Sequence, residues 1–194
     1  LDELVAEVVA NSGDAPPPAQ FVADLLTTAT AENQTQAVTQ LLGVVAQPDE
    51  QGAFALWQLD AFGGLLDTLA LGESAGGEEL ATQIDLMFDF AHETVKQHDA
   101  PLELRLASVR LLGRGPGGEA ANFELLGALL GPNEPRELQS AAVEAFGQSG
   151  EDRAAGYLLA AWKTFSPTLR SDVLEMLFSR EAWLMETLNA VEEG

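Results

Sequence analysis

Two aspartates and a histidine in this chain have spacing that would suit a metal site. Asp85, Asp89 and His92 lie at positions i, i+4 and i+7, so a helix would bring their side chains to one face. One imidazole and two carboxylates can hold a divalent metal, which would make the chain a metal-dependent hydrolase. The competing interpretation is a solvated helix face, and Lys96, one turn further on, favours ordinary surface charge pairing.

Other kinds of catalytic chemistry find no support in the sequence. The chain has no cysteine, which excludes disulfides, thiolate nucleophiles, cysteine–zinc sites and covalent haem attachment. The serines have only His92 and His98 as partners, and neither histidine lies in a triad motif. The glycine-rich stretch at 73–77 has no strand before it and no lysine after it, so it does not fit a phosphate-binding loop. We therefore expect no catalytic residue, no metal site and no cofactor.

The charge of the chain is strongly negative and unevenly distributed. The net charge is −22, and residues 1–95 contain 16 acidic residues but no lysine or arginine. This field repels nucleic acid and anionic lipid headgroups. It either serves solubility or attracts a basic protein, for which Asp85, Asp89 and Glu93 are the candidate binding residues. No apolar run approaches the roughly 18 residues that span a bilayer, so we expect no direct membrane insertion.

The elements that position these residues are organised around a repeated stretch. Residues 104–113 (LRLASVRLLG) recur as 138–147 (LQSAAVEAFG) and, more loosely, as 169–178 (LRSDVLEMLF). Repeats with a period of 20–50 residues are typical of stacked units, and each unit here has the pattern of a helix-turn-helix. Pro101, Pro135 and Pro167 suit the first turns of the second helices, and Gly113 and Gly147 suit helix ends that need a left-handed residue.

Apolar spacing predicts helices along the whole chain and no sheet. The expected ranges are 1–11, 19–29, 32–46, 51–71, 78–97, 101–113, 119–130, 135–147, 151–163, 167–178 and 180–192. We predict an all-α fold, an α-α superhelix of antiparallel helix pairs. Residues 1–97 would form irregular, acidic helical repeats and residues 98–194 regular ones, in one continuous solenoid.

The same pattern predicts which side chains point inward. These include the three tryptophans and an apolar group at each end of the chain, namely Phe21, Val22, Leu25, Leu26, Trp57, Trp162, Trp183, Leu184, Leu188 and Val191. Arg105 and Arg170 hold the same place in their repeats. We expect each to pair with a carboxylate of the adjacent turn, and the alternative is that they bind a partner.

These residues support a resemblance at two levels. Residues 104–113 and 138–147 resemble the second helix of HEAT repeats, whereas 169–178 departs by having Phe178 in the glycine position. More narrowly, the chain resembles the HEAT-repeat segment of the large PVC-type haem-binding proteins, also called putative membrane-bound dehydrogenases. The similar stretches are 100–114, 125–130, 137–145, 167–170, 177–180 and 182–183.

The resemblance implies a scaffold in a larger extracytoplasmic, or periplasmic, protein. In that family a β-propeller precedes the repeats and a cytochrome c domain follows them, so the partners would be other domains of the parent protein. The leading hypothesis is therefore a non-enzymatic scaffold or protein-interaction segment. The alternatives are an acidic docking module for a basic partner such as a cytochrome c domain, and the metal-dependent hydrolase.

Overall fold

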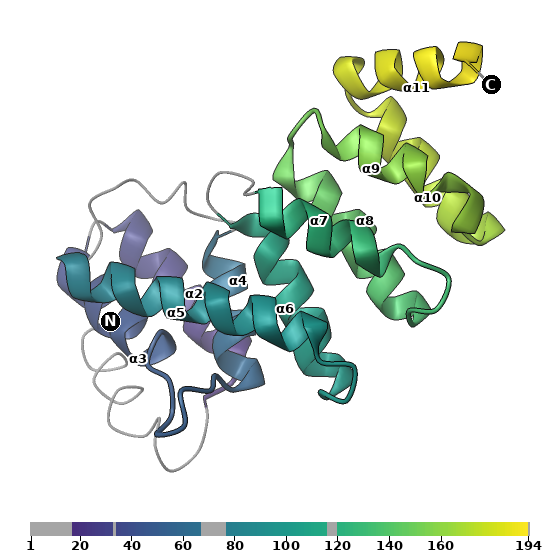
Figure 1. The fold of residues 1–194 in the computed structure, drawn as a ribbon. Helices are drawn as coiled ribbons and strands as arrows, with labels where there is room; N and C mark the ends of the chain where they lie inside the picture. Colours follow the sequence, from purple (N-terminus) through teal and green to yellow (C-terminus); the bar gives the residue numbers. More distant parts are fainter. Residues whose placement is uncertain (1–16, 33, 67–76, 116–119, 194) are drawn as a thin grey trace. The chain divides into compact units, whose positions relative to one another are not determined.

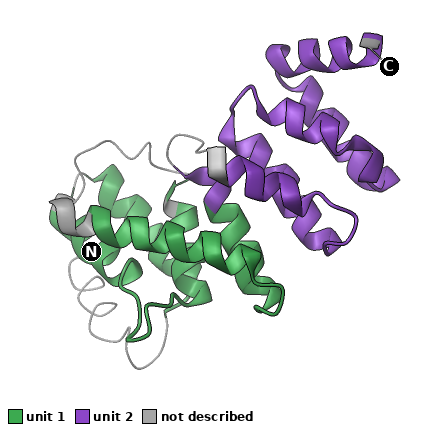
Figure 2. Ribbon diagram, in the orientation of Figure 1, with its two compact units in different colours: residues 1–111 green, residues 112–194 purple. Residues whose placement is uncertain are grey.

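The fold is helical throughout the part of the chain that the structure describes (Figure 1). The computed structural model describes residues 17–32, 34–66, 77–115 and 120–193, and these ranges contain helices but no strand. The all-α prediction is thus confirmed for these residues, whereas the helix predicted at 1–11 lies outside them. The chain divides into two compact units, Leu1–Leu111 and Leu112–Gly194 (Figure 2).

The first three described helices of the first unit pack on one another. Helix α2 (Ala19–Ala31) packs against α3 (Thr35–Val45) and α4 (Leu56–Leu66), and α3 also packs against α4. Their shared core is aliphatic with one aromatic ring, because Val22, Leu26, Leu41, Leu42 and Phe62 are fully buried. Phe21 was predicted to point inward, but it is exposed, because it lies one residue outside the stripe of α2 formed by Val22, Leu25, Leu26 and Ala29.

The predicted helix at 51–71 begins later than the apolar pattern indicated. Asp49 closes a turn over residues 49–53, since its carboxylate accepts hydrogen bonds from the Gln51 and Ala53 backbone amides at 2.8 and 2.9 Å. Gly52 provides the positive φ of 80° that this turn needs. Helix α4 therefore begins at Leu56 and is described to Leu66. The predicted continuation to residue 71 lies outside the described residues.

A long amphipathic helix follows, and aromatic contacts join it to the preceding segment. Helix α5 (Gly77–Lys96) buries Met87, Ala91 and Val95 along one face. Phe88 meets Phe62 of α4 edge to face at 6.1 Å between ring centroids. Phe90 meets Phe54 in the same way at 5.5 Å. Helix α6 (Leu102–Arg114) comes next and carries the first copy of the repeated stretch.

The described helices of the second unit are short, and their contacts follow a repeating pattern. They are α7 (Ala120–Leu129), α8 (Arg136–Ser149), α9 (Ala154–Ala160), η2 (Trp162–Thr164), α10 (Pro167–Phe178) and α11 (Glu181–Glu193). Helix α7 contacts α8 and α9, α8 contacts α9 and α10, and α11 contacts both α9 and α10. The alternate helices α7, α9 and α11 therefore follow one another in contact, and so do α8 and α10. The predicted helix at 151–163 is interrupted: α9 ends at Ala160, and Trp162–Thr164 form the separate 3-10 turn η2. Arg170 donates to the Trp162 and Lys163 carbonyls of that turn.

Aromatic rings fill the centre of this unit. Phe123 of α7, Phe146 of α8 and Tyr157 of α9 form a three-ring cluster with centroid distances of 5.3 to 5.8 Å. Phe123 and Phe146 are buried, and Arg153 lies over the Phe123 ring at 4.3 Å. Three helices thus share one core, in which aromatic pairs add to apolar burial.

The structure corrects the role of two glycines. Gly113 and Gly147 were expected to end helices in a left-handed conformation, but both lie inside α6 and α8. Among the described residues only Gly52 and Gly150 have positive φ. A Cβ on Gly113 would come within 2.6 Å of Ala145, and one on Gly147 within 2.7 Å of Met176. These glycines therefore allow neighbouring helices to approach closely.

Candidate interaction surfaces

Asp85, Asp89 and His92 do not form a metal site in this structure. Asp85 and Asp89 are exposed on α5, whereas His92 is half-buried and its Nε2 atom is buried without a hydrogen-bond partner. The His92 Nδ1 atom lies 3.9 Å from a carboxylate oxygen of Glu93. Within the described residues, no three histidine, cysteine, aspartate or glutamate side chains are grouped so that they could hold a metal. The hydrolase interpretation has no site in this part of the chain.

The three carboxylates proposed for partner binding lie along one helix but differ in their surroundings. Asp85, Asp89 and Glu93 are all exposed at successive turns of α5. Glu93 accepts a hydrogen bond of 2.7 Å from Lys96 Nζ, as the surface-pairing interpretation of Lys96 requires. This hydrogen bond and the Lys96 charge lower the pKa of Glu93. Lys96 therefore offsets part of the negative charge that Glu93 would offer a basic partner.

Arg105 and Arg170 have a structural role, but their acceptors are not the predicted carboxylates. Arg105 is buried, and its Nε and Nη2 atoms donate to the Val95 carbonyl oxygen at 3.2 and 3.0 Å. Arg170 donates in the same way to the carbonyls of Trp162 and Lys163, at 3.2 and 3.3 Å. Each arginine thus donates to backbone carbonyls where the preceding helical segment ends, at the last turn of α5 for Arg105 and in η2 for Arg170.

Two glutamines likewise donate hydrogen bonds to backbone carbonyls of the segment that precedes their helix. Gln139 holds the Arg105 position in the second copy, and its Nε2 donates to the Gly131 carbonyl at 2.7 Å. Gln58 of α4 donates to the carbonyls of Val45 and Gln47 at 2.9 and 2.7 Å. Sequence reasoning missed both glutamines, although the alignment of Gln139 with Arg105 was a signal for the first.

The tryptophans are less uniformly buried than predicted. Trp183 of α11 is fully buried, and its Nε1 donates to the Glu151 carbonyl at 3.2 Å. Trp57 and Trp162 are only half-buried. The Arg170 guanidinium lies over the Trp162 ring at 5.5 Å, and Arg180 lies over Trp183 at 5.0 Å. Only Trp183 is thus a core residue in the full sense.

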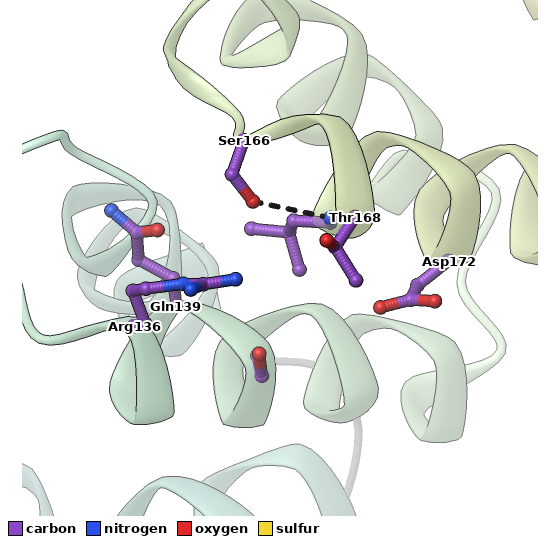
Figure 3. A pocket seen from close by; sticks show the side chains of 7 residues that line it. Arg136, Gln139, Ser166, Thr168 and Asp172 are labelled. Carbon is purple, nitrogen blue, oxygen red and sulfur yellow. Dashed lines mark hydrogen bonds between the residues drawn. The ribbon is translucent and has the colours of Figure 1, made fainter.

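A small polar pocket lies between α8 and α10 (Figure 3). Its labelled side chains are Arg136 and Gln139 from α8, with Ser166, Thr168 and Asp172 from α10 and the residue before it. Ser166 caps α10, because its hydroxyl accepts from the Leu169 amide at 3.3 Å. The pocket has a volume of about 30 Å³, which is room for a water molecule but not for a substrate.

A larger groove lies among α9, η2, α10 and α11, and we call it the C-terminal groove. It has a volume of about 500 Å³ and mostly apolar walls, formed by Leu159, Ala160, Trp162, Lys163, Leu174, Leu177, Thr187, Ala190 and Val191. Leu188 and Val191 were predicted to point inward, but they are exposed, Val191 by 73%. They are exposed because no described element packs on this side of α11. Phe178 in the glycine position was the sequence signal for this difference.

Among the described helices, none combines the length and the apolar character that a membrane span requires. Comparison of the chain with protein-family models, curated proteins and solved structures finds no match.

Proposed function

We propose that this chain is a non-enzymatic helical-repeat scaffold, a HEAT-like solenoid of antiparallel helix pairs. The observation that carries the proposal is that equivalent residues of the repeated stretch make equivalent contacts. Arg105, Gln139 and Arg170 each donate to a carbonyl in the last turn of the preceding helix or just beyond that helix. Such repetition is typical of proteins whose units are stacked copies of one helix pair.

The contacts between successive copies of the repeat support the same proposal. A Cβ on Gly113 would come within 2.6 Å of Ala145 in the second copy, and one on Gly147 within 2.7 Å of Met176 in the third copy. In the other row of helices, Tyr157 of α9 lies against Gly127 of α7. Glycines of one repeat thus lie against larger residues of the next, which lets successive helices approach closely.

The larger context of the scaffold follows from the resemblance alone. We propose that the segment belongs to an extracytoplasmic protein of the haem-binding, dehydrogenase-like class, in which it holds other domains in place. Its side chains then supply surfaces and spacing. The chemistry would belong to the neighbouring domains.

Small-angle X-ray scattering of the isolated chain tests the solenoid. A compact domain of 194 residues has a radius of gyration of about 16 Å. A solenoid of stacked pairs is expected to exceed this value clearly while circular dichroism shows full helix content. A radius of gyration near the compact value, from a folded monomer, would contradict the proposal.

A second candidate function is the docking of a basic protein on the acidic first unit. It is favoured by the exposure of Asp85 and Asp89 on α5, in a half of the chain that lacks lysine and arginine before Lys96. Such binding depends on exposed charges, which salt screens over a distance of about 8 Å at physiological ionic strength. We therefore expect fast association that weakens steeply with salt.

A titration with a basic c-type cytochrome tests this candidate. Binding is measured at about 20 mM and about 300 mM salt, between which the screening length shortens severalfold. Reversal of Asp85 and Asp89 to lysine should abolish it. The matched control reverses Glu124 and Glu144, which are exposed in the second unit. Binding that is absent, or that both pairs of substitutions weaken equally, argues against docking on α5.

A further inference from the structure

Helices α8 and α10 meet at the glycine that ends the second copy of the repeat. Gly147 is the tenth residue of that copy, and Met176 is the eighth residue of the third copy. The Met176 methyl carbon and sulfur lie 2.7 and 2.9 Å from the point that a Cβ on Gly147 would occupy. The Met176 thioether therefore packs against the backbone of α8, in a space that exists because residue 147 has no side chain.

The equivalent contact between the first two copies contains no sulfur. Gly113 is the tenth residue of the first copy, and its neighbour Ala145 is the eighth residue of the second. Ala145 is 1% exposed, and its methyl group is inert to mild oxidants. The two contacts thus join the same positions of successive copies but differ in chemistry, because the second one places a thioether between the helices.

Methionine provides the only sulfur atoms of this chain. The sequence has three methionines and no cysteine, so no thiol competes for a peroxide. The three methionines differ in exposure, since Met87 is fully buried, Met176 is half-buried and Met185 is 52% exposed. A peroxide should therefore reach Met176 and Met185 in the folded protein before it reaches Met87. Of the first two, Met176 is the one that packs against Gly147.

Oxidation of Met176 would turn an apolar contact into a polar one. The sulfur lone pair attacks one oxygen of hydrogen peroxide, the O–O bond breaks, and the products are methionine sulfoxide and water. The sulfur loses the two electrons that the peroxide gains. The new oxygen is a hydrogen-bond acceptor, whereas the amides inside α8 already donate along their own helix. The sulfoxide therefore finds no donor on the α8 backbone, and its burial there is unfavourable.

Either position of the oxidised side chain weakens the packing of α10 on α8. If the sulfoxide stays in the contact, its extra oxygen crowds the Gly147 backbone, where even a Cβ atom has too little room. If the sulfoxide turns to solvent, it leaves a gap beside Gly147, and apolar burial is lost. The contact between the second and third copies is thus sensitive to oxidation, whereas the contact between the first and second is not.

The helix that follows α10 is held by the same end of α8. Arg180 lies between α10 and α11 and donates to the Gly150 carbonyl at 3.1 Å. Trp183 of α11 donates to the Glu151 carbonyl at 3.2 Å. Both acceptors lie a few residues after Gly147. Loosening of α10 beside Gly147 should therefore also affect the hydrogen bonds that hold α11.

We propose that Met176 is a redox-sensitive switch, at which a peroxide weakens the packing of α10 and α11 on the end of α8. The switch is reversible, because methionine sulfoxide reductases return the sulfoxide to the thioether. All of these contacts lie within the second unit. The inference therefore goes beyond the proposed scaffold function and does not depend on it.

Peroxide treatment of the full 194-residue chain tests the switch. Peptide mass spectrometry measures the oxygen gained at each methionine, and urea unfolding followed by circular dichroism measures stability. We expect Met176 and Met185 to be oxidised at least about tenfold faster than Met87. The urea midpoint should fall by about 0.5 M or more and should recover after reductase treatment. Hydrogen exchange should become at least about tenfold faster in 143–151 and 167–178 but stay unchanged in α2.

Two leucine variants assign the loss of stability to one sulfur. Met176→Leu keeps a similar side-chain volume without the sulfur. It should still be oxidised at Met185, but peroxide should shift its urea midpoint by less than about 0.1 M. Met185→Leu is the matched control and should lose stability as the wild type does. If Met176→Leu does not fold, Met185→Leu decides alone, because the other remaining methionine, Met87, is buried.

Three results would overturn the inference. Oxidation of Met176 no faster than that of Met87 would show that peroxide does not reach the contact in the folded protein. Complete oxidation of Met176 with an unchanged urea midpoint would show that the α8–α10 contact tolerates the sulfoxide. Equal losses in the wild type and in Met176→Leu, with no loss in Met185→Leu, would assign the effect to Met185.

Discussion

Gly113 of α6 and Ala145 of α8 are in such close contact that a Cβ atom on the glycine would lie 2.6 Å from both the Cα and the Cβ of the alanine. Part of this neighbour is backbone, which cannot move aside as a flexible side chain can. Gly113→Ala should therefore destabilise the protein by about 1–3 kcal/mol through overpacking. Urea unfolding followed by circular dichroism measures the change.

Gly43 of α3 provides the matched control for that substitution. It also lies inside a helix, but a Cβ there would meet nothing within 4 Å. Gly43→Ala should stabilise the protein by up to about 1 kcal/mol, because alanine has the higher helix propensity. Stabilisation of similar size at both positions would mean that helix packing at Gly113 is looser than the structure shows.

Phe146 is the central ring of the aromatic cluster in the second unit. It is fully buried and contacts Phe123 and Tyr157. Phe146→Ala should reduce the free energy of unfolding by about 3–5 kcal/mol, since it removes apolar burial and leaves a cavity. Glu144→Ala, at an exposed position of the same helix, should change it by less than about 0.5 kcal/mol. Equal costs in urea titrations would show that the repeat register is wrong.

The helical content and the approximate helix positions could be predicted from the sequence because they depend on local signals. Pro135 directly precedes α8 and Pro167 begins α10, as prolines at helix starts predict. The late start of α4 was missed because the apolar pattern continues through residues 51–55. There the Asp49 carboxylate forms a turn in place of a helix.

The surfaces were harder to predict, because they depend on which neighbours exist. An apolar residue has the same pattern on a covered face as on an open one, so Leu188 and Val191 were expected in the core but are exposed. In the same way, the sequence indicates that Arg105 is structural but does not identify its acceptor. That acceptor is a carbonyl of the preceding helix, which only the packed pair brings within reach.

Arg105 allows a direct test of the hydrogen bond that each copy of the repeat makes to the preceding helical segment. Arg105→Met keeps the length and apolar part of the buried side chain but removes both donors to the Val95 carbonyl. It should cost about 1–3 kcal/mol, because a buried acceptor is left without that donor. Arg105→Gln should cost less, since Gln139 makes the equivalent bond in the second copy. Thermal and urea unfolding measure the stability of both variants. A glutamine variant no more stable than the methionine variant would contradict the shared role.

Asp60 of α4 predicts a pH dependence of stability. Asp60 is exposed overall, but partial burial of its carboxyl raises the pKa above its ordinary value of 3.8, against the opposing charge of Arg110, and Glu103 adds to the rise. The folded state therefore binds the proton more tightly than the unfolded state. Between the ordinary and the raised pKa the folded state holds more protons, so this contribution to stability is lost as pH rises through that window.

Asp60→Asn should remove this dependence and make the protein more stable than wild type at neutral pH, with the difference shrinking as pH falls below the window. Glu93→Gln is the opposite control, because Lys96 lowers the pKa of Glu93. Its contribution is present above the ordinary glutamate pKa and is lost as pH falls. Urea midpoints of wild type and both variants, from about pH 3 to pH 7, should therefore give differences of opposite sign at neutral pH. A difference for Asp60→Asn that does not vary with pH would show that the carboxyl is as well solvated in the folded chain as in the unfolded one.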